Sequence, residues 1–267
     1  MSISNNIRKI LLLCAGILTG GGVIVLLIAA VHSRSEQVCQ GYEITIANEN
    51  SKQLFVDKND ILNVITAGKT TSLKNKAIKS IDLNRIEARL KREVWVNDAE
   101  LFFDNSGILK ISVLQRVPVA RVFTSSGESF YIDSNCKKLP VSVKSSAKLP
   151  VFTGYPFSNK KMLPGERKLL NQVKQLGMYI ANDPFWMAQV AQVDITPSRD
   201  FELVPTVGNH IIEFGSAAEM VAKFDRLMTF YKQVLVKTGM DKYEKLKVQY
   251  TGQVIGVKAE ETTKNSN

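Results

Sequence analysis

The strongest constraint on the fold of this chain is one unbroken apolar segment near its start. Residues 10–31 contain no charged side chain, and no later segment of the sequence is like it. An α-helix rises 1.5 Å per residue, so about 20 apolar residues cross the hydrocarbon core of a membrane. The apolar part of a cleaved signal peptide is shorter, at about 7–15 residues. The sequence therefore predicts one transmembrane helix over residues 10–31, with nearly all of the chain on one side of the membrane.

The charged residues on either side of the apolar segment predict on which side of the membrane most of the chain lies. Arg8 and Lys9 precede the apolar segment, whereas Arg34 is the one basic residue that closely follows it. Because cytoplasmic flanks carry the excess of Lys and Arg, residues 1–9 are predicted to be a cytoplasmic tail and the remainder to be exported. This is the topology of a single-pass type II membrane protein.

Two further features of the sequence leave alternatives open. Gly16 and Gly20 have the GxxxG spacing, which is either a helix-dimer face or a pair of tolerated small residues. The net charge of +10 would attract anionic lipid or anionic wall polymer, or it reflects a Lys-rich surface without such a partner. Nucleic acid is not expected as a partner, because the basic part of the chain is predicted to be exported.

The exported part is expected to fold. The chain is 45% hydrophobic and 22% charged, which is ordinary for a globular protein. Residues 32–40 are predicted to be a polar linker, and residues 259–267 a disordered polar tail. The first module, residues 41–116, has the order strand–helix–helix–strand–strand, in which Asp57 and Asp82 are placed to cap the two helices.

The second module, residues 117–258, is predicted to be mostly β with flanking helices, so the fold class is α+β. Residues 216–219 read Ser-Ala-Ala-Glu, the pattern of a capping box, and predict the start of a long helix that ends at Gly239. Residues 245–250 and 253–258 then predict a final pair of strands around a turn at Thr251 and Gly252.

Residues that carry catalytic chemistry are scarce. The chain has two histidines and three cysteines, and their spacing matches no recognised metal site. We therefore expect no catalytic residues, no cofactor and no metal, and a protein that is not an enzyme. Cys39 and Cys136 are predicted to share an oxidising compartment, where they either form a bridge or stay free. Binding through an exposed strand edge is the physical alternative to catalysis.

Several short motifs, in this order and spacing, resemble the bacterial cell-division FtsQ/DivIB family over essentially the whole chain. They are Gln115–Ala120 (QRVPVA), Tyr131–Asp133 with Leu139–Pro140, Leu149–Gly154 (LPVFTG), His210–Gly215 (HIIEFG), and Leu246–Tyr250 with Gly252–Ile255. The first module is similar to the POTRA domain of that family. Two positions depart from the family pattern: Gln115 stands where a glutamate is frequent, and Cys136 where a glycine is usual. If the latter position needs a positive φ, a cysteine there is strained, and Asn135 could adopt that conformation instead.

The resemblance implies a non-enzymatic divisome scaffold at the septum, held in the inner (cytoplasmic) membrane, that links early division assembly to septal peptidoglycan synthesis. The implied partners are FtsB- and FtsL-like bitopic proteins, docking on the terminal strands, and other divisome components through the POTRA-like module. The docking residues carried over are Val248, Tyr250, Thr251, Gly252, Gln253 and Ile255, of which Val248 and Ile255 could equally be core residues. Arg116 and Pro118 are expected to have a structural role at the junction of the modules.

Two other functions stay open on the sequence alone. A membrane-anchored cell-wall enzyme would have the same topology and basic charge, although no catalytic signature supports it. A POTRA-type secretion or assembly factor would share the first module. Such factors usually carry several of these modules or a membrane barrel, and neither is predicted in this sequence.

Overall fold

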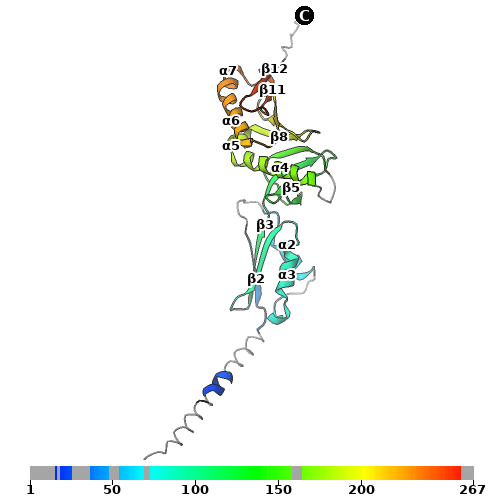
Figure 1. Ribbon diagram of the computed structural model, residues 1–267. Coiled ribbons are helices and arrows are strands. Elements are labelled where there is room, and N and C mark those ends of the chain that lie inside the picture. Colours follow the sequence, from blue (N-terminus) through cyan, green and yellow to red (C-terminus); the bar gives the residue numbers. More distant parts are fainter. Residues whose placement is uncertain are drawn as a thin grey trace, which may run out of the picture. The chain divides into compact units, whose positions relative to one another are not determined.

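The computed structural model describes residues 16, 19–25, 37–47, 54–68, 73–142, 144–157 and 164–259. These residues divide into two units. The first unit holds Val56–Gln115 and the described residues up to Ala47, and the second holds the residues from Arg116 onward with the short stretch that ends at Phe55. Both units mix helices with a β-sheet, so the predicted α+β class is confirmed (Figure 1).

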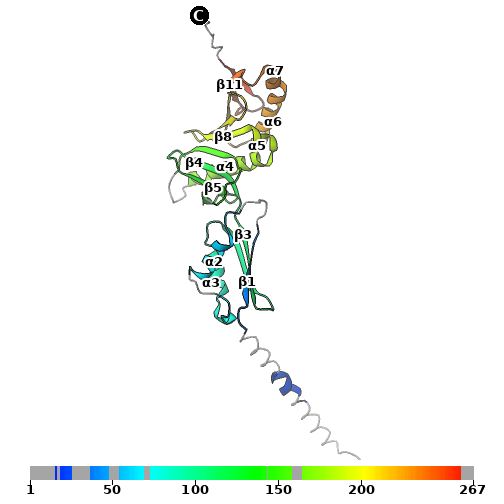
Figure 2. The same cartoon turned by 180° about the vertical axis from the view of Figure 1, so that it is seen from behind.

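The first unit is a three-stranded sheet with helices on one side. Its elements are β1 (Gly41–Ala47), α2 (Lys58–Thr66), the 3₁₀ turn η1 (Ile78–Ser80), α3 (Leu83–Leu90), β2 (Val96–Phe103) and β3 (Ile108–Gln115). The strand order is β1-β3-β2, with β1 parallel and β2 antiparallel to the central β3. Figure 2 shows β1 and β3 side by side, with α2 and α3 against the sheet. The strand–helix–helix–strand–strand order is as predicted.

Local sequence explains where these two helices begin. The Asp57 side chain accepts a hydrogen bond from the Asp60 N–H at 2.9 Å, and the Asp60 side chain accepts one from the Asp57 N–H at the same distance. Asp82 likewise accepts from the N–H of Arg85 at 3.0 Å. Both predicted caps are confirmed. Each satisfies N–H groups that a helix start would otherwise leave unpaired, a contribution of about 1 kcal/mol per cap.

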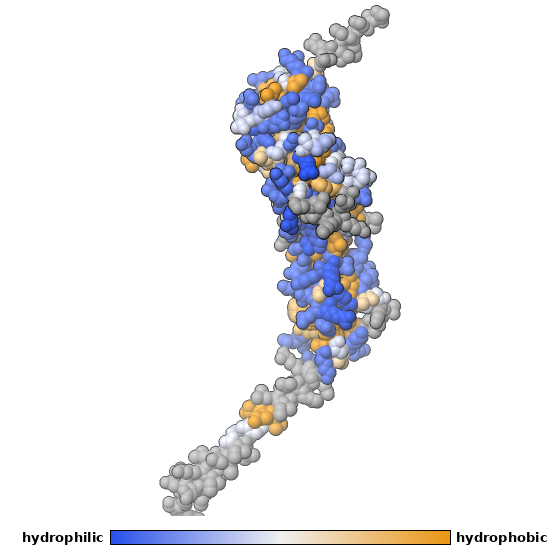
Figure 3. All heavy atoms as spheres, turned by 45° about the vertical axis from the view of Figure 1, so that its right-hand side comes forward, coloured by the Kyte–Doolittle hydropathy of each residue, from blue (hydrophilic) through white to orange (hydrophobic). Residues whose placement is uncertain are grey.

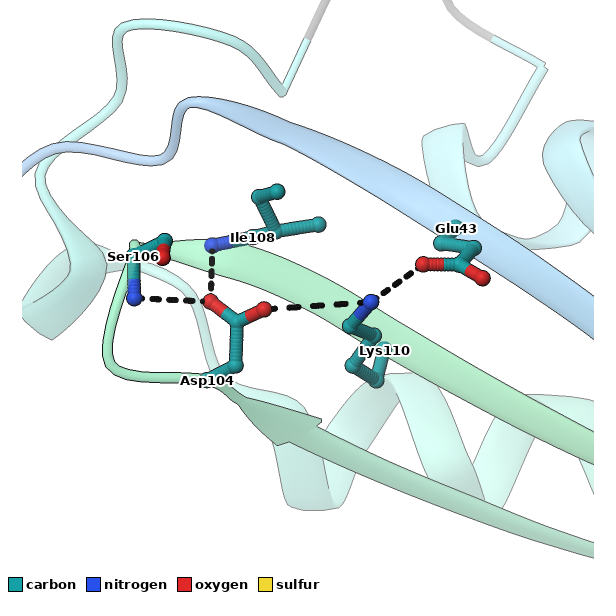
Figure 4. A network of polar contacts seen from close by, with 5 residues as sticks. All are labelled: Glu43, Asp104, Ser106, Ile108 and Lys110. Atoms are coloured by element: carbon teal, nitrogen blue, oxygen red, sulfur yellow. Dashed lines mark hydrogen bonds and ion pairs between the residues drawn. The ribbon is translucent and has the colours of Figure 1, made fainter.

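The hairpin between β2 and β3 is closed by a network around Asp104 (Figure 4). One carboxylate oxygen of Asp104 accepts from the N–H groups of Ser106 and Ile108, both at 2.9 Å. Its other oxygen lies 3.8 Å from the ammonium of Lys110, which also pairs with Glu43 on β1. This pairing with Glu43 raises the pKa of Lys110. The network therefore ties all three strands together at one end of the sheet.

The second unit is built on a nine-stranded mixed sheet. Its strands are β4 (Pro118–Thr124), β5 (Ser129–Asp133), β6 (Lys138–Pro140), β7 (Val151–Tyr155), β8 (Val190–Ile195), β9 (Phe201–Pro205), β10 (Ile211–Gly215), β11 (Tyr243–Lys247) and β12 (Ile255–Lys258). Their order is β12-β11-β10-β9-β8-β7-β4-β5-β6. Strand β7 is parallel to both of its neighbours, β4 and β8, and β10 is parallel to β11.

Helices close one face of this sheet. They are α4 (Pro164–Asn182), α5 (Pro184–Gln189), α6 (Met220–Phe230), the π-helical turn η2 (Tyr231–Leu235) and α7 (Val236–Thr238). Alternate residues of β4 and β9 are buried, as expected of strands with one covered face. The core combines sheet residues such as Phe152, Leu203 and Phe214 with Trp186 of α5 and Phe224 of α6.

The long helix after residue 216 differs from its prediction in two ways. The capping box is wrong: helix α6 begins at Met220, its N-terminal flank Glu219 is left-handed at φ 51°, and no side chain of the described structure caps it. The Lys223 ammonium instead donates to the Ser216 carbonyl at 2.8 Å, which holds the turn in another shape. The helix is also not uniform, because the π-helical turn η2 inserts one residue before α7. It does end at Gly239, which has φ 88°.

Within the described residues, no helix is both long and apolar enough to cross a membrane. Most of the predicted transmembrane segment, residues 10–31, lies outside the described residues. So do the predicted cytoplasmic tail and residues 260–267 of the predicted C-terminal tail. Of the segment, Gly16 and residues 19–25 are helical, and Val23, Ile24 and Val25 are all more than half exposed.

Candidate partner-docking edge

The nine-stranded sheet of the second unit ends in two strands of different character. At one end, β6 has only three residues, and Pro140 has no N–H to donate to another strand. At the other end, β12 runs over Ile255–Lys258 without proline, and in the described structure only β11 pairs with it. An edge strand presents unpaired N–H and C=O groups to which a partner strand can bond. Of the two ends, β12 is therefore the one at which no proline opposes an added strand.

The predicted docking residues lie at or just before this edge, with one exception. Tyr250 is 45% exposed and Ile255 is 40% exposed, and Thr251, Gly252 and Gln253 between them are exposed as well. Val248 is fully buried in the core of the second unit. Its N–H donates to the Glu213 carbonyl at 3.0 Å. The structure thus brings five of the six residues to one surface and places Val248 beneath it.

The sheet surface beside the edge combines apolar and basic side chains. Ile255 pairs with Lys247, and Val257 with Lys245, so these four side chains lie on the same face of the β11–β12 pair. Both lysines reach Glu213 on β10, at 3.3 Å and 3.5 Å. Val257 was not singled out from the sequence, although it is 36% exposed. A partner strand paired with β12 would contact the apolar side chains of Ile255 and Val257 directly. The positive charges of Lys245 and Lys247 would lie on the next strand, β11.

A glycine allows strand β12 to pass close beneath an aromatic ring. A Cβ atom at Gly256 would lie 2.5 Å from the Cε1 atom of Tyr243. The Tyr243 ring packs edge-on against Phe230 of α6, with 5.4 Å between the ring centroids. A glycine at position 256 therefore lets Tyr243 cover the strand. Sequence reasoning missed this contact, because the two residues are neighbours only after β11 and β12 pair.

A groove of about 380 Å³ opens beside the same edge. One wall is the helical segment of α6 and η2, and the other is the chain just before β12. The lining residues are Asp225, Arg226, Thr229, Phe230, Gln233, Val234, Gly252, Gln253 and Val254. On the face shown in Figure 3, the described surface is largely polar, with small apolar areas scattered over both units.

The predicted junction residues Arg116 and Pro118 both lie next to Asp133. Pro118 pairs with Asp133 in the β4–β5 ladder, and the Arg116 guanidinium contacts the Asp133 carboxylate at 2.8 Å. The other oxygen of Asp133 accepts from the N–H groups of Asn135 and Lys137, at 2.9 Å and 2.8 Å. The Asp133 side chain is 3% exposed and that of Arg116 is 13% exposed. This buried ion pair organises the β5–β6 turn, and the sequence alone did not indicate that the two residues would meet.

The two departures from the family motifs have structural counterparts. Gln115 is buried, and its side-chain oxygen accepts from the Val56 N–H at 3.1 Å. Cys136 has φ 60°, so the cysteine itself is left-handed, and the expectation that Asn135 would take this conformation is wrong. The Asp133 side chain accounts for this geometry, because it accepts from the N–H groups of Asn135 and Lys137 on both sides of Cys136. Cys136 and Cys39, which belong to different units, are both free thiols in the described structure.

His210 forms a buried polar cluster that the sequence did not reveal. Its Nε2 atom lies 2.8 Å from the Tyr231 hydroxyl, and its Nδ1 atom lies 3.2 Å from the Met240 carbonyl. Burial lowers the pKa of His210, against smaller opposing effects of the Met240 carbonyl and of Asp241.

We expect this histidine to make the second unit less stable in mild acid. Above the unfolded-state pKa of about 6.5, His210 is neutral in both states. Below it, the unfolded chain takes up a proton that the folded chain resists, so the free energy of unfolding falls by at most about 1.4 kcal/mol per pH unit. Urea unfolding between pH 7.5 and 5.5, followed by Trp186 fluorescence in a Trp95→Phe chain, measures this. A His210→Gln variant should show a flatter profile, and equal slopes in both chains would contradict the prediction.

No group of three or more metal-ligating side chains is found among the described residues. The residues along β12 and just before it offer backbone groups of an edge strand, exposed apolar and polar side chains, and two nearby lysines. These groups can bind an extended chain segment.

Comparison with known families matches both units. A family model described as FtsQ/DivIB, C-terminal related, matches residues 117–257, which is more than half of the chain. A model of the POTRA-like domain matches residues 37–114. No curated protein matches the chain significantly.

Proposed function

This chain belongs to the FtsQ/DivIB family, and we propose from this that it binds FtsB- and FtsL-like division proteins by strand addition to β12. The two family domains suggest a cell-division scaffold, and domains of these types are typically not enzymes. The proposed role is to link early cytoplasmic division assembly to septal peptidoglycan synthesis. The POTRA-like unit would contribute contacts with other divisome components.

One observation carries the docking proposal: the two ends of the nine-stranded sheet are not equivalent. Pro140 and the short length of β6 oppose strand addition at that end. Strand β12 instead carries the exposed side chains of Ile255 and Val257, and exposed Tyr250 lies shortly before it. In strand addition, main-chain hydrogen bonds give affinity, and alternate side chains give specificity. The exposed apolar residues of β12 therefore favour a partner with apolar side chains at alternate positions.

We further propose that residues 10–31 hold the protein in the inner membrane, with residues 1–9 in the cytoplasm. The uncharged run of apolar residues supports the span, and the flanking Arg8 and Lys9 support the orientation. Docking at β12 would then take place outside the cytoplasm, at the division septum.

The docking proposal is tested by placing a charge on the edge. Val257→Asp in the full chain is expected to lower the affinity for the organism's own FtsB–FtsL-type complex about tenfold or more, since an apolar contact is replaced by a charge that must be desolvated. Val207→Asp is the matched control, because Val207 is 53% exposed but lies in the loop between β9 and β10. Tyr250→Ala tests the same surface without adding a charge. Equal affinities of all variants, each with the tryptophan emission spectrum of the wild-type chain, would overturn docking at this edge.

Depletion in the native cell tests the division role itself. Cells that lose the protein are expected to grow as filaments with segregated chromosomes and without completed septa. Division should be restored by the wild-type chain and by Val207→Asp, but not by Val257→Asp. Normal cell length after depletion would rule out the division role.

A further inference from the structure

The chain between β11 and β12 needs support from outside the sheet. Val248 is the last residue before the turn to bond a neighbouring strand, through its N–H and the Glu213 carbonyl. The next six residues leave the sheet and return at Ile255, where β12 begins. Gly252 lies in the middle of this excursion with φ 76°. Strand β12 is held by its pairing with β11, and the contacts of residues 248–254 hold the chain that leads into it.

Arg226 of helix α6 holds this segment through two carbonyls. Its Nη2 atom donates to the carbonyl of Val248 at 3.2 Å and to that of Tyr250 at 3.3 Å. The bonds are charge-assisted, which makes them stronger than bonds between neutral groups. The Nε atom of the same side chain is buried and has no partner among the described residues. A half-buried guanidinium that leaves one donor unpaired while it bonds two carbonyls of the same short segment points to a specific constraint on that segment.

The groove beside Arg226 makes its two hydrogen bonds more important for the turn. Its two walls are the α6–η2 segment, which includes Arg226, and residues Gly252–Val254 immediately before β12. Open space thus separates much of the turn from the helix beside it. The hydrogen bonds of Arg226 to the Val248 and Tyr250 carbonyls join the helix to the first part of the turn.

We propose that Arg226 is a positioning residue for strand addition: it fixes the turn so that the free edge of β12 is presented in one shape. The inference rests on the proposed function, because it concerns the same docking edge. A partner that offers an extended segment pairs with β12 at lower entropic cost if the edge is already ordered. Without Arg226, ordering of the turn would be deferred to the moment of binding.

The test compares Arg226→Gln with Arg167→Gln in the full chain. Both variants lose one guanidinium, but Arg167 is an exposed residue of α4. In Arg226→Gln, amide hydrogen exchange of residues 251–257 is expected to be at least tenfold faster, while exchange at Phe214 and Leu246 in the neighbouring strands stays unchanged. Affinity for the FtsB–FtsL-type complex should fall about tenfold. Arg226→Lys should give intermediate values, since an ammonium retains the charge but has a shorter reach.

The outcomes separate the inference from the proposed function. Unchanged exchange at residues 251–257 overturns the role of Arg226, whether or not the partner binds. Faster exchange throughout the second unit overturns it as well, because Arg226 would then act on global stability. Faster local exchange with unchanged affinity for the complex also overturns it. If the wild-type chain fails to bind the complex, the docking proposal is overturned, and the positioning role falls with it even if the exchange result holds.

Discussion

Replacement of Gly256 by alanine is expected to disrupt the docking edge more than any exposed substitution on it. The new Cβ atom would lie 2.5 Å from the Tyr243 ring, so either the ring or strand β12 must move. Phe230 packs edge-on against the same ring and limits its movement. Overpacking of this kind costs about 1–3 kcal/mol, and if partner binding has to reverse it, affinity falls about tenfold to a hundredfold. Affinity for the FtsB–FtsL-type complex measures the effect.

A double variant separates steric conflict from simple loss of flexibility. If the Tyr243 ring is the obstacle, Gly256→Ala combined with Tyr243→Ala should show a favourable coupling energy of about 0.5–3 kcal/mol relative to the sum of the single variants. Val207→Ala serves as the control, because that side chain is exposed and lies in the loop between β9 and β10. Additive effects of Gly256→Ala and Tyr243→Ala would refute the proposed role of the glycine.

The second large effect is expected at Asp133. Asp133→Ala removes the carboxylate that pairs with Arg116 and accepts the N–H groups of Asn135 and Lys137. Breaking a buried ion pair from one side costs about 3–5 kcal/mol, since the remaining charge stays buried without its partner. Urea unfolding of a Trp95→Phe chain, followed by Trp186 fluorescence, reports the loss in the second unit.

Two variants calibrate that measurement. Asp225→Ala removes an exposed carboxylate from α6 and should change the free energy of unfolding by no more than about 0.5 kcal/mol. Asp133→Asn keeps an oxygen that can accept the two N–H groups but loses the charge, so it should lie between the wild type and Asp133→Ala. A loss below about 1 kcal/mol for Asp133→Ala would show that Arg116 is well solvated without its partner.

Features that depend on residues close together in the sequence could be predicted. The caps at Asp57 and Asp82 and the turn closed by Asp104 each depend on groups within four positions of one another. The helix at residue 216 shows the limit of such rules. Its local pattern fitted a capping box, but a left-handed Glu219 and the bond from Lys223 to the Ser216 carbonyl produced a different start.

Features that depend on distant pairing could not be predicted. The order of the nine strands brings β4 beside β7, across the intervening β5 and β6, and only this order makes β12 and β6 the two ends of the sheet. The ion pair of Arg116 with Asp133 and the cover of Gly256 by Tyr243 arise in the same way. The family motifs directed attention to the terminal strands. The structure was needed to show that Val248 lies below their surface and Val257 on it.

The parallel pairing of β10 with β11 also has a consequence for biogenesis. Parallel neighbours require a crossover, and here α6, η2 and α7 form that connection between the two strands. Strand β12 then adds to β11, so the binding edge is the last part of the second unit to form along the chain. A chain in which β12 has not yet paired ends its sheet at another strand, β11 or β10, and does not present the edge described above. If a partner binds at β12 as proposed, the binding site is complete only when the last strand of the second unit is in place.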